Sequence, residues 1–426
     1  MLVTLPDMST PQGKAQKSPG NRKFKLAAVL LALTVFFVIP ELLVRALSGT
    51  DQERYRAIQF GGDANSEELF VKDHELHWAL RPNSNVPFLG ATTITNSRGF
   101  RVAKARREHP DCSQVLCVGD STTFGWGVPG PNVFASVLEK TLSREDPEAN
   151  WIVHNAGVPG FSSQQMREMA ARWIPILKPK VVVICIGNND AWPARTSDLE
   201  AQQGGFASGV TRLLGKSAFL SWAASLLRGQ EEPENPIYFA EDSVPRVSDD
   251  EMAANMEAVV ALARQYEARP LILAAPANLH FPPRNMNAEI EKYRALGDQI
   301  SAEIEKQNVD AATKLADDAL EKDPKHIYLQ WLRAMVTALA SDPVRGREEL
   351  EAVFEQHRFP DRARRTYRNR QRAVALAQDV PFADVNELFL AGREAKAAQK
   401  LYLDWCHPTA DGHKVMANTL AEWIVP

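Results

Sequence analysis

Hydrophobic and polar positions follow the periods of strands and helices from residue 114 to the end of the chain. Short runs of consecutive apolar residues predict buried strands, and apolar residues spaced three or four apart predict helices. The predicted strands are 114–119, 151–156, 180–187, 270–275 and 381–385, and the predicted helices are 133–142, 164–177, 249–266, 364–378 and 412–424. Strands that alternate with helices indicate a parallel sheet with helices on both faces.

Two stretches interrupt this alternation. Residues 197–248 combine glycines, a short apolar segment and the exposed-looking sequence QEEPENP. Residues 309–357 have a helical pattern throughout, and the ALEKDP step inside them resembles a tetratricopeptide repeat. Because a repeat stack needs about three units to be stable alone, we expect this small helical insert to pack on the main domain.

The N-terminal residues differ in character from the rest. Residues 1–24 form a polar, basic tail that we expect to be disordered. Residues 26–39 carry no charge, although this run of 14 is shorter than the ~20 residues of a full membrane span. We favour an uncleaved transmembrane signal anchor over residues 25–47. A cleaved signal peptide ending near Ser48 is the alternative. Both place the remaining chain in the periplasm or outside the cell.

Composition narrows the classes of function. The 426 residues are 45% hydrophobic and 24% charged, with a net charge of −4, so no basic footprint indicates nucleic-acid binding. The four cysteines form no CxxC pair and have no zinc-ligand spacing with histidine. We therefore expect neither a metal nor a cofactor.

Chemically useful residues follow the predicted strands. Ser121 comes directly after the first strand, Gly160 after the second and Asn189 after the third, while Asp404 and His407 lie close to the C-terminus. The carboxyl ends of parallel strands share one edge of a sheet, where ligands bind. A serine nucleophile needs a base, a group that orients the base, and donors for an oxyanion. At a spacing of three, Asp404 can orient His407. The backbone N–H of Ser121 opens a helix, Gly160 permits close backbone approach, and Asn189 offers an amide donor.

These residues carry a resemblance to a known family. The segments Gly119-Asp120-Ser121, Gly160, Gly187-x-Asn189-Asp190 and Asp404-x-x-His407 resemble, in order, the four sequence blocks of the SGNH (GDSL-type) hydrolases. In the first block Thr122 stands where the GDSL string has leucine. The resemblance implies a flavodoxin-like three-layer α/β/α sandwich. It also implies that Ser121 is the nucleophile, His407 the base and Asp404 its partner, with Ser121, Gly160 and Asn189 forming the oxyanion hole.

The resemblance also sets the expected organisation and function. We divide the chain into a lead-in module (51–112), a hydrolase domain in two parts (113–308 and 358–426) and the helical insert (309–357). We expect a serine esterase acting on an acyl ester, foremost an acetyl ester, of a small molecule or an envelope polysaccharide. Transfer of the acyl group to a sugar hydroxyl, and a catalytically inert envelope scaffold, remain alternatives. The insert is a candidate surface for a protein partner.

Overall fold

The computed structural model describes residues 66–73, 75–104, 112–194, 197–203, 243–283, 287–357 and 360–425, with eight single positions between 25 and 39. The chain divides into two compact units, Met1–Arg54 with Gly204–Pro233, and Tyr55–Gln203 with Glu234–Pro426. Nearly all described residues belong to the second unit. The predicted tail (1–24) lies outside the described residues, as does most of the predicted anchor (25–47). Of the helices that the structure describes, none has both the length and the apolar character needed to cross a membrane.

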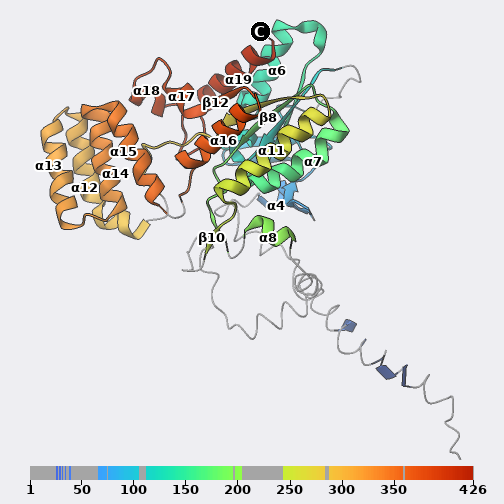
Figure 1. The fold of residues 1–426 in the computed structure, drawn as a ribbon, viewed down its shortest axis with the longest axis horizontal. Coiled ribbons are helices and arrows are strands. Elements are labelled where there is room, and N and C mark those ends of the chain that lie inside the picture. Colours follow the sequence, from blue (N-terminus) through green and yellow to red (C-terminus); the bar gives the residue numbers. More distant parts are fainter. Residues whose placement is uncertain are drawn as a thin grey trace, which may run out of the picture. The chain divides into compact units, whose positions relative to one another are not determined.

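The second unit is built around an eight-stranded sheet with the order β12-β11-β8-β6-β7-β5-β4-β3 (Figure 1). Its parallel strands are β6 (Gln114–Gly119), β7 (Ile152–Gly157), β8 (Val181–Ile186), β11 (Arg269–Ala274) and β12 (Phe382–Asp384). Numbered along the chain, these strands have the order 2-1-3-4-5, which is the flavodoxin-like arrangement. The predicted fold class, a flavodoxin-like three-layer sandwich with a parallel sheet, is therefore confirmed.

Helices cover both faces of the sheet. Alternate residues of each strand point to opposite sides, so each strand contributes side chains to an apolar core on either face. Leu116 and Val118 of β6 pack against α7 (Ser163–Leu177), α11 (Asp249–Gln265) and α16 (Arg365–Ala377). Val115 and Cys117 pack on the other side against α6 (Phe134–Glu145) and α19 (Ala410–Ile424). Two separate apolar cores thus hold the sheet in position, and both faces of its parallel strands are buried.

The lead-in module extends this sheet. Strands β3 (Asn85–Phe88), β4 (Ala91–Thr95) and β5 (Arg101–Val102) are antiparallel, and β5 pairs with β7. A separate hairpin joins β1 (Phe70–Asp73) to β2 (His77–Leu80), after the short helix α4 (Ser66–Leu69). The sequence predicted short strands in this region but gave no sign that three of them continue the central sheet.

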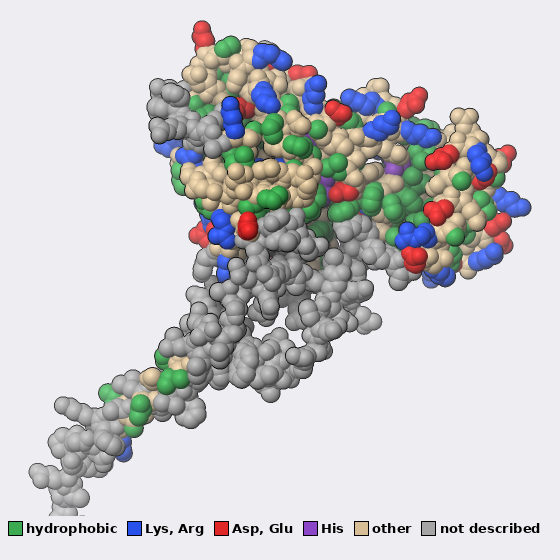
Figure 2. All heavy atoms as spheres, turned by 180° about the vertical axis from the view of Figure 1, so that it is seen from behind, with side chains coloured by type: hydrophobic (Ala, Val, Ile, Leu, Met, Phe, Trp, Pro, Cys, Tyr) green, Lys and Arg blue, Asp and Glu red, His purple; other side chains and the backbone are tan. Residues whose placement is uncertain are grey.

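The helical insert has an apolar core of its own. It comprises α12 (Asn287–Glu305), α13 (Val309–Lys322), α14 (Ile327–Val336), a π-helical turn η5 (Thr337–Ser341) and α15 (Pro343–Gln356). Helix α12 packs against α13 and α14, so the bundle includes a helix that the predicted boundary at 309 left in the hydrolase domain. Figure 2 shows charged side chains of both signs spread over the outer surface of these helices.

Smaller elements complete the described structure. Helix α5 (Ser121–Phe124) follows β6, and α17 (Val385–Leu390) and α18 (Ala395–Gln399) lie between β12 and the C-terminal helix. Strands β9 (Pro193–Ala194) and β10 (Val244–Pro245) pair beside α8 (Asp198–Gln203), and the single-turn helices η2 (Gly130–Asn132) and η3 (Pro147–Ala149) flank α6. The loop between α18 and α19 holds Asp404 and His407 at the carboxyl edge of the sheet.

Candidate active site

Ser121 is fixed at the start of α5 by the sharp end of strand β6. The Asp120 carboxylate caps this helix, since its Oδ1 accepts a hydrogen bond from the Thr122 backbone N–H at 2.8 Å. A Cβ atom at Gly119 would collide with the carbonyl oxygen of Cys185, so the turn leaves no room for a side chain. The strand therefore ends in glycine, and the next residues turn at once into a helix whose first residue is Ser121.

Ser121, His407 and Asp404 form one hydrogen-bonded chain. The distance from His407 Nε2 to Ser121 Oγ is 2.8 Å, and His407 Nδ1 lies 2.7 Å from Asp404 Oδ2. With the Nδ1 proton donated to the carboxylate, Nε2 is free to accept the proton of the serine hydroxyl. Ser121 and His407 are 286 residues apart in the sequence. The structure thus brings together the three residues that the sequence predicted as nucleophile, base and orienting group.

Asp404 is held by both of its oxygens. Its Oδ1 accepts hydrogen bonds at 2.9 Å from the backbone N–H groups of Cys406 and His407. Burial raises the pKa of this carboxyl, but the hydrogen bond and charge of His407 and the two backbone donors outweigh burial and hold the pKa below its ordinary value. Asp404 is therefore ionised at neutral pH, as a residue that stabilises an imidazolium must be.

The Gly160 amide is oriented by the peptide that contains it. Gly160 has φ +79°, a conformation that favours glycine. The carbonyl oxygen of Pro159 accepts from Trp78 Nε1 at 3.0 Å, and that of Gly160 accepts from Arg246 Nη1 at 2.8 Å. Because the peptide bond is trans, fixing the Pro159 carbonyl also fixes the Gly160 N–H in the opposite direction. No described residue accepts a hydrogen bond from this N–H.

Asn189 lies beside the same segment and is almost fully buried. One N–H of its Nδ2 donates to the Phe161 carbonyl oxygen at 2.9 Å. The side-chain amide has a second N–H, which remains to serve a reacting group. The structure therefore brings Asn189 next to the Gly160 turn, as the predicted oxyanion hole requires.

Residues outside the predicted triad and oxyanion hole also contact the triad. The Trp126 ring stacks on the His407 ring, with centroids 5.2 Å apart and planes at 17°. The Asn278 side-chain amide donates to the Asp404 carbonyl oxygen at 3.0 Å, and its backbone N–H donates to the Trp405 carbonyl at 2.8 Å. In the sequence, these two residues are marked only by their place after predicted strands: Trp126 follows residues 114–119, and Asn278 follows residues 270–275.

Arg101 supports α5 from the lead-in module. It donates hydrogen bonds to the carbonyl oxygens of Phe124, Gly125 and Val128 at 2.9, 2.6 and 2.6 Å. These bonds give partners to carbonyl groups at the C-terminal end of the helix that carries Ser121, which have none within the helix. Burial lowers the pKa of Arg101 to about 10, so the guanidinium stays charged at neutral pH. The lead-in module therefore contributes directly to the position of Ser121.

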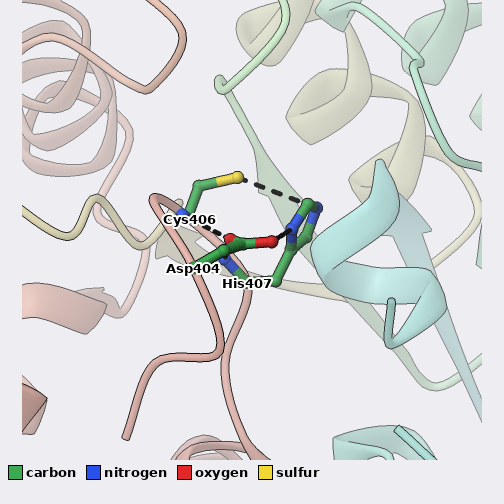
Figure 3. Close-up of side chains that lie close together, drawn as sticks. All are labelled: Asp404, Cys406 and His407. Atoms are coloured by element: carbon green, nitrogen blue, oxygen red, sulfur yellow. Dashed lines mark hydrogen bonds and ion pairs between the residues drawn. The ribbon is translucent and has the colours of Figure 1, made fainter. Parts of the chain in front are cut away.

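Asp404, Cys406 and His407 form a cluster of possible metal ligands, since one ligand atom from each lies within 4.8 Å of the others. Figure 3 shows the Cys406 thiol directed toward one nitrogen of the His407 ring and the Asp404 carboxylate toward the other, and Cys406 Sγ lies 3.7 Å from His407 Nε2. Burial raises the pKa of the Cys406 thiol well above its usual range, whereas a thiolate is the form that binds metals. The same Nε2 and Oδ2 atoms already serve the hydrogen-bonded chain to Ser121. These side chains fit the triad better than they fit a metal.

The fold and this constellation define a three-layer α/β protein with a serine, a histidine and an aspartate in hydrogen-bond contact. Residues 117–330 match the model of the GDSL-like Lipase/Acylhydrolase family. This match covers half of the chain, and the chain belongs to that family, which makes it an ester-hydrolysing enzyme. The matched range includes Ser121, Gly160 and Asn189 and ends before Asp404.

Solved structures similar to this chain include an alpha/beta hydrolase enzyme from the metagenome of Lake Arreo, Spain, with 16% identity, coverage of 74% of this chain and 96% of that chain, and a TM-score of 0.35. A lipase/acylhydrolase from Enterococcus faecalis has 13% identity, 74% and 95% coverage, and a TM-score of 0.36. A catalytic mutant of an acetylxylan esterase from Geobacillus stearothermophilus has 15% identity, 74% and 95% coverage, and a TM-score of 0.33. No curated protein matches the chain.

Proposed function

We propose that the chain is a serine esterase that removes an acyl group, foremost acetyl, from a carbohydrate through a covalent acyl-enzyme. The observation that carries this proposal is the pair of short contacts from His407, 2.8 Å to Ser121 Oγ and 2.7 Å to Asp404 Oδ2. In that arrangement the imidazole is in reach of the serine proton while its tautomer is fixed by the carboxylate.

The proposed reaction has two halves. Ser121 Oγ attacks the ester carbonyl as His407 takes its proton, and the backbone N–H groups of Ser121 and Gly160 with the Asn189 amide stabilise the oxyanion. His407 then returns the proton to the leaving alcohol, and Ser121 carries the acyl group. Water attacks the acyl-enzyme with His407 again as base, which releases the carboxylic acid and restores Ser121.

Burial and aromatic side chains support the substrate class. Ser121, Asn189 and His407 are 6%, 4% and 4% exposed, which favours a small acyl group at the nucleophile. Trp126 and Trp405 are both half-buried, and both contact the His407 ring, Trp126 in a stacked and Trp405 in a T-shaped arrangement. The flat apolar surfaces of indole rings suit the apolar face of a sugar ring.

Acyl transfer to a sugar hydroxyl is the second candidate, because it uses the same acyl-enzyme. The low exposure of Ser121 and His407 favours it, since a site with restricted access gives a bound sugar hydroxyl an advantage over water. Purified protein should be assayed with an acetylated polysaccharide, and separately with an acetyl donor and a sugar acceptor. Acetate release without acetylated sugar supports the esterase. Acetylated sugar as the main product supports the transferase.

An inert envelope scaffold is the third candidate, and a fluorophosphonate probe distinguishes it. An active Ser121 reacts covalently with the probe, and the label should disappear in Ser121→Ala. A native, folded protein that takes up no label would support the scaffold instead.

We also propose that an N-terminal anchor holds the enzyme at a membrane, with the catalytic unit in the periplasm or outside. The support is the basic segment before the uncharged run at 26–39. Alkaline washing of membranes should leave the full-length protein bound. A soluble form that begins near Gly49 would show a cleaved signal peptide.

The helical insert is proposed to favour a polymeric substrate or a protein partner. Since α12 shares the apolar core of α13 and α14, the deletion that tests this should replace 287–357 by a Gly/Ser linker. The deletion variant should still hydrolyse a small aryl ester, and its activity on the polysaccharide should be lower than that of the wild type. Equal activity on both substrates would leave docking of a partner as the role of the insert.

A further inference from the structure

A cavity lies between the helical insert and the hydrolase part, and its lining does not include Ser121. It has a volume of about 490 Å³ and is bounded by residues 277–280 after β11, by η5 and α15, and by α17 and α18. Its walls are mainly apolar, and they include Ala338, Leu339, Leu350, Phe389, Leu390 and Ala398. Such a volume, with apolar walls and few polar groups, is typical of small-molecule sites.

Arg347 of α15 brings a positive charge to this cavity. Its side chain is half-buried, and its guanidinium forms no hydrogen bond or ion pair with a described residue. The carboxylate one helical turn further on, Glu351, is already bonded to Arg368. The charge of Arg347 opposes the rise in the pKa of Glu351, so the two groups interact electrostatically, but no carboxylate of a described residue hydrogen-bonds the Arg347 guanidinium. A guanidinium that is partly withdrawn from water without such a direct partner is unfavourable, and a bound anion would offset that cost.

His280 lines the cavity near Arg347 and adds a neutral polar group. Burial, together with the charge of Arg347, lowers the pKa of the His280 imidazole to about 4, so the ring is neutral at pH 7 and can donate one hydrogen bond. The lining also includes the exposed side chains of Arg393, Glu394 and Lys396. Three cationic groups and one carboxylate give the lining a positive balance.

We propose that this cavity binds an amphipathic anion, namely a carboxylate on an unbranched hydrocarbon chain. The carboxylate pairs with the Arg347 guanidinium, whose planar donors match two carboxylate oxygens. The hydrocarbon chain lies along the apolar wall formed by η5, α15 and α17. A single half-buried guanidinium beside a neutral imidazole suits a monoanion better than a phosphate dianion.

The cavity is next to the catalytic loop but does not include the triad. Asn278 lines the cavity, and its side-chain amide donates to the Asp404 carbonyl oxygen at 3.0 Å. A ligand in the cavity is therefore separated from the triad by one hydrogen-bonded residue. The binding site does not depend on the proposed reaction, and it can be tested in protein whose Ser121 is blocked.

The test uses full-length protein treated with a fluorophosphonate, titrated calorimetrically with decanoate, decanol and acetate. We expect saturable binding of one decanoate, and at least tenfold weaker binding of decanol and of acetate. Arg347→Gln should weaken decanoate binding at least tenfold, which is about 1.4 kcal/mol. The matched control is Arg345→Gln, an exposed position on the same helix that pairs with Glu349 at 2.8 Å, and it should bind as the wild type does.

A cavity-filling variant covers the case in which Arg347→Gln does not fold. Leu339→Trp keeps the charge but occupies the apolar end, and it should abolish decanoate binding. Equal affinity for decanol and decanoate, equal losses in Arg345→Gln and Arg347→Gln, or no saturable binding would each overturn the proposal. The same titrations are repeated with untreated protein. Decanoate binding that is unchanged in untreated Leu339→Trp and absent after fluorophosphonate treatment would also overturn the proposal, because the ligand would then occupy the active site.

Discussion

Buried charges are handled differently at the catalytic edge of the sheet and at the junction with the helical insert. At the catalytic edge, Asp120 and Asp190 each bond a backbone N–H through Oδ1, at 2.8 and 2.7 Å, while Oδ2 of each has no hydrogen bond within the described structure. Burial raises the pKa of Asp120 to about 6 and that of Asp190 to about 7. These carboxyls are buried without an opposite charge in contact.

At the junction with the insert, buried charges of opposite sign are in contact. Arg368 lies between Glu351 of α15 and Asp384 at the end of β12, and its Nε is 3.2 Å from Asp384 Oδ2. Burial raises the pKa of Glu351, and the charges of Arg368, Arg347 and Arg365 partly offset this rise. The contrast shows that this chain pairs buried charges where the insert joins the hydrolase part, and leaves Asp120 and Asp190 without a charged partner at the edge of the sheet that carries Ser121.

The largest expected effect is removal of the triad. Ser121→Ala and His407→Ala should each lower kcat on p-nitrophenyl acetate by on the order of 10⁶-fold. The double variant should be no worse than either single one, because the two residues act as a unit. A double variant with far lower activity than both single variants would show that Ser121 and His407 act independently.

Loss of one oxyanion donor should have a smaller effect. Asn189→Ala should cost about 2.7–4 kcal/mol of transition-state stabilisation, seen as a lower kcat with little change in KM. Asn188→Ala is an informative neighbour, because the Asn188 Oδ1 accepts from the Ala363 backbone N–H at 2.9 Å and serves the fold. A wild-type kcat in Asn189→Ala would remove this residue from the site.

Much of the fold could be predicted because strands buried on both faces leave a clear apolar run. Residues 114–119, for example, were predicted as a strand and form β6. Helix α12, which the predicted boundary at 309 left in the hydrolase part, shares the apolar core of the insert, because an amphipathic pattern does not tell which core its apolar face joins. The extension of the sheet by β3, β4 and β5 was also missed, since short edge strands pair through contacts that depend on the whole fold.

The candidate site shows the same limit. The spacing of Asp404 and His407 and the position of Ser121 after a strand identified three residues that the structure brings into contact. The stacking of Trp126 on His407 and the cavity beside Arg347 depend on loops whose relative positions no local pattern encodes. The roles assigned to the predicted residues remain a matter for the kinetic tests above.

Loss of a buried ion pair at the junction with the insert should lower the free energy of unfolding. Glu351→Ala should lower the free energy of unfolding by about 3 kcal/mol, because it leaves the buried Arg368 with one carboxylate fewer. Glu349→Ala, two residues away, removes an ion pair with the exposed Arg345 and should cost less than about 1 kcal/mol. Denaturant unfolding of both variants measures the difference. Equal losses would show that burial of the pair contributes nothing beyond a surface ion pair.

The smallest effect expected is a pH-dependent gain of stability in Asp190→Asn. Because burial raises the folded-state pKa of Asp190 from 3.8 to about 7, the native state holds a proton that the unfolded state releases across this window. Stability of the wild type therefore falls as pH rises from about 4 to about 7 and is not lowered further by this group above that range.

The Asp190→Asn variant tests this dependence, because asparagine does not titrate and keeps an oxygen for the Ser163 N–H. The stability gain of Asp190→Asn over the wild type should be larger at pH 8 than at pH 5 by about 2.7 kcal/mol in chemical unfolding. Asp250→Asn, at a carboxylate whose side chain is 83% exposed, should show little change at either pH. A stability difference between Asp190→Asn and wild type that is the same at both pH values would mean that Asp190 is ionised throughout, and the contrast between the two regions would not hold.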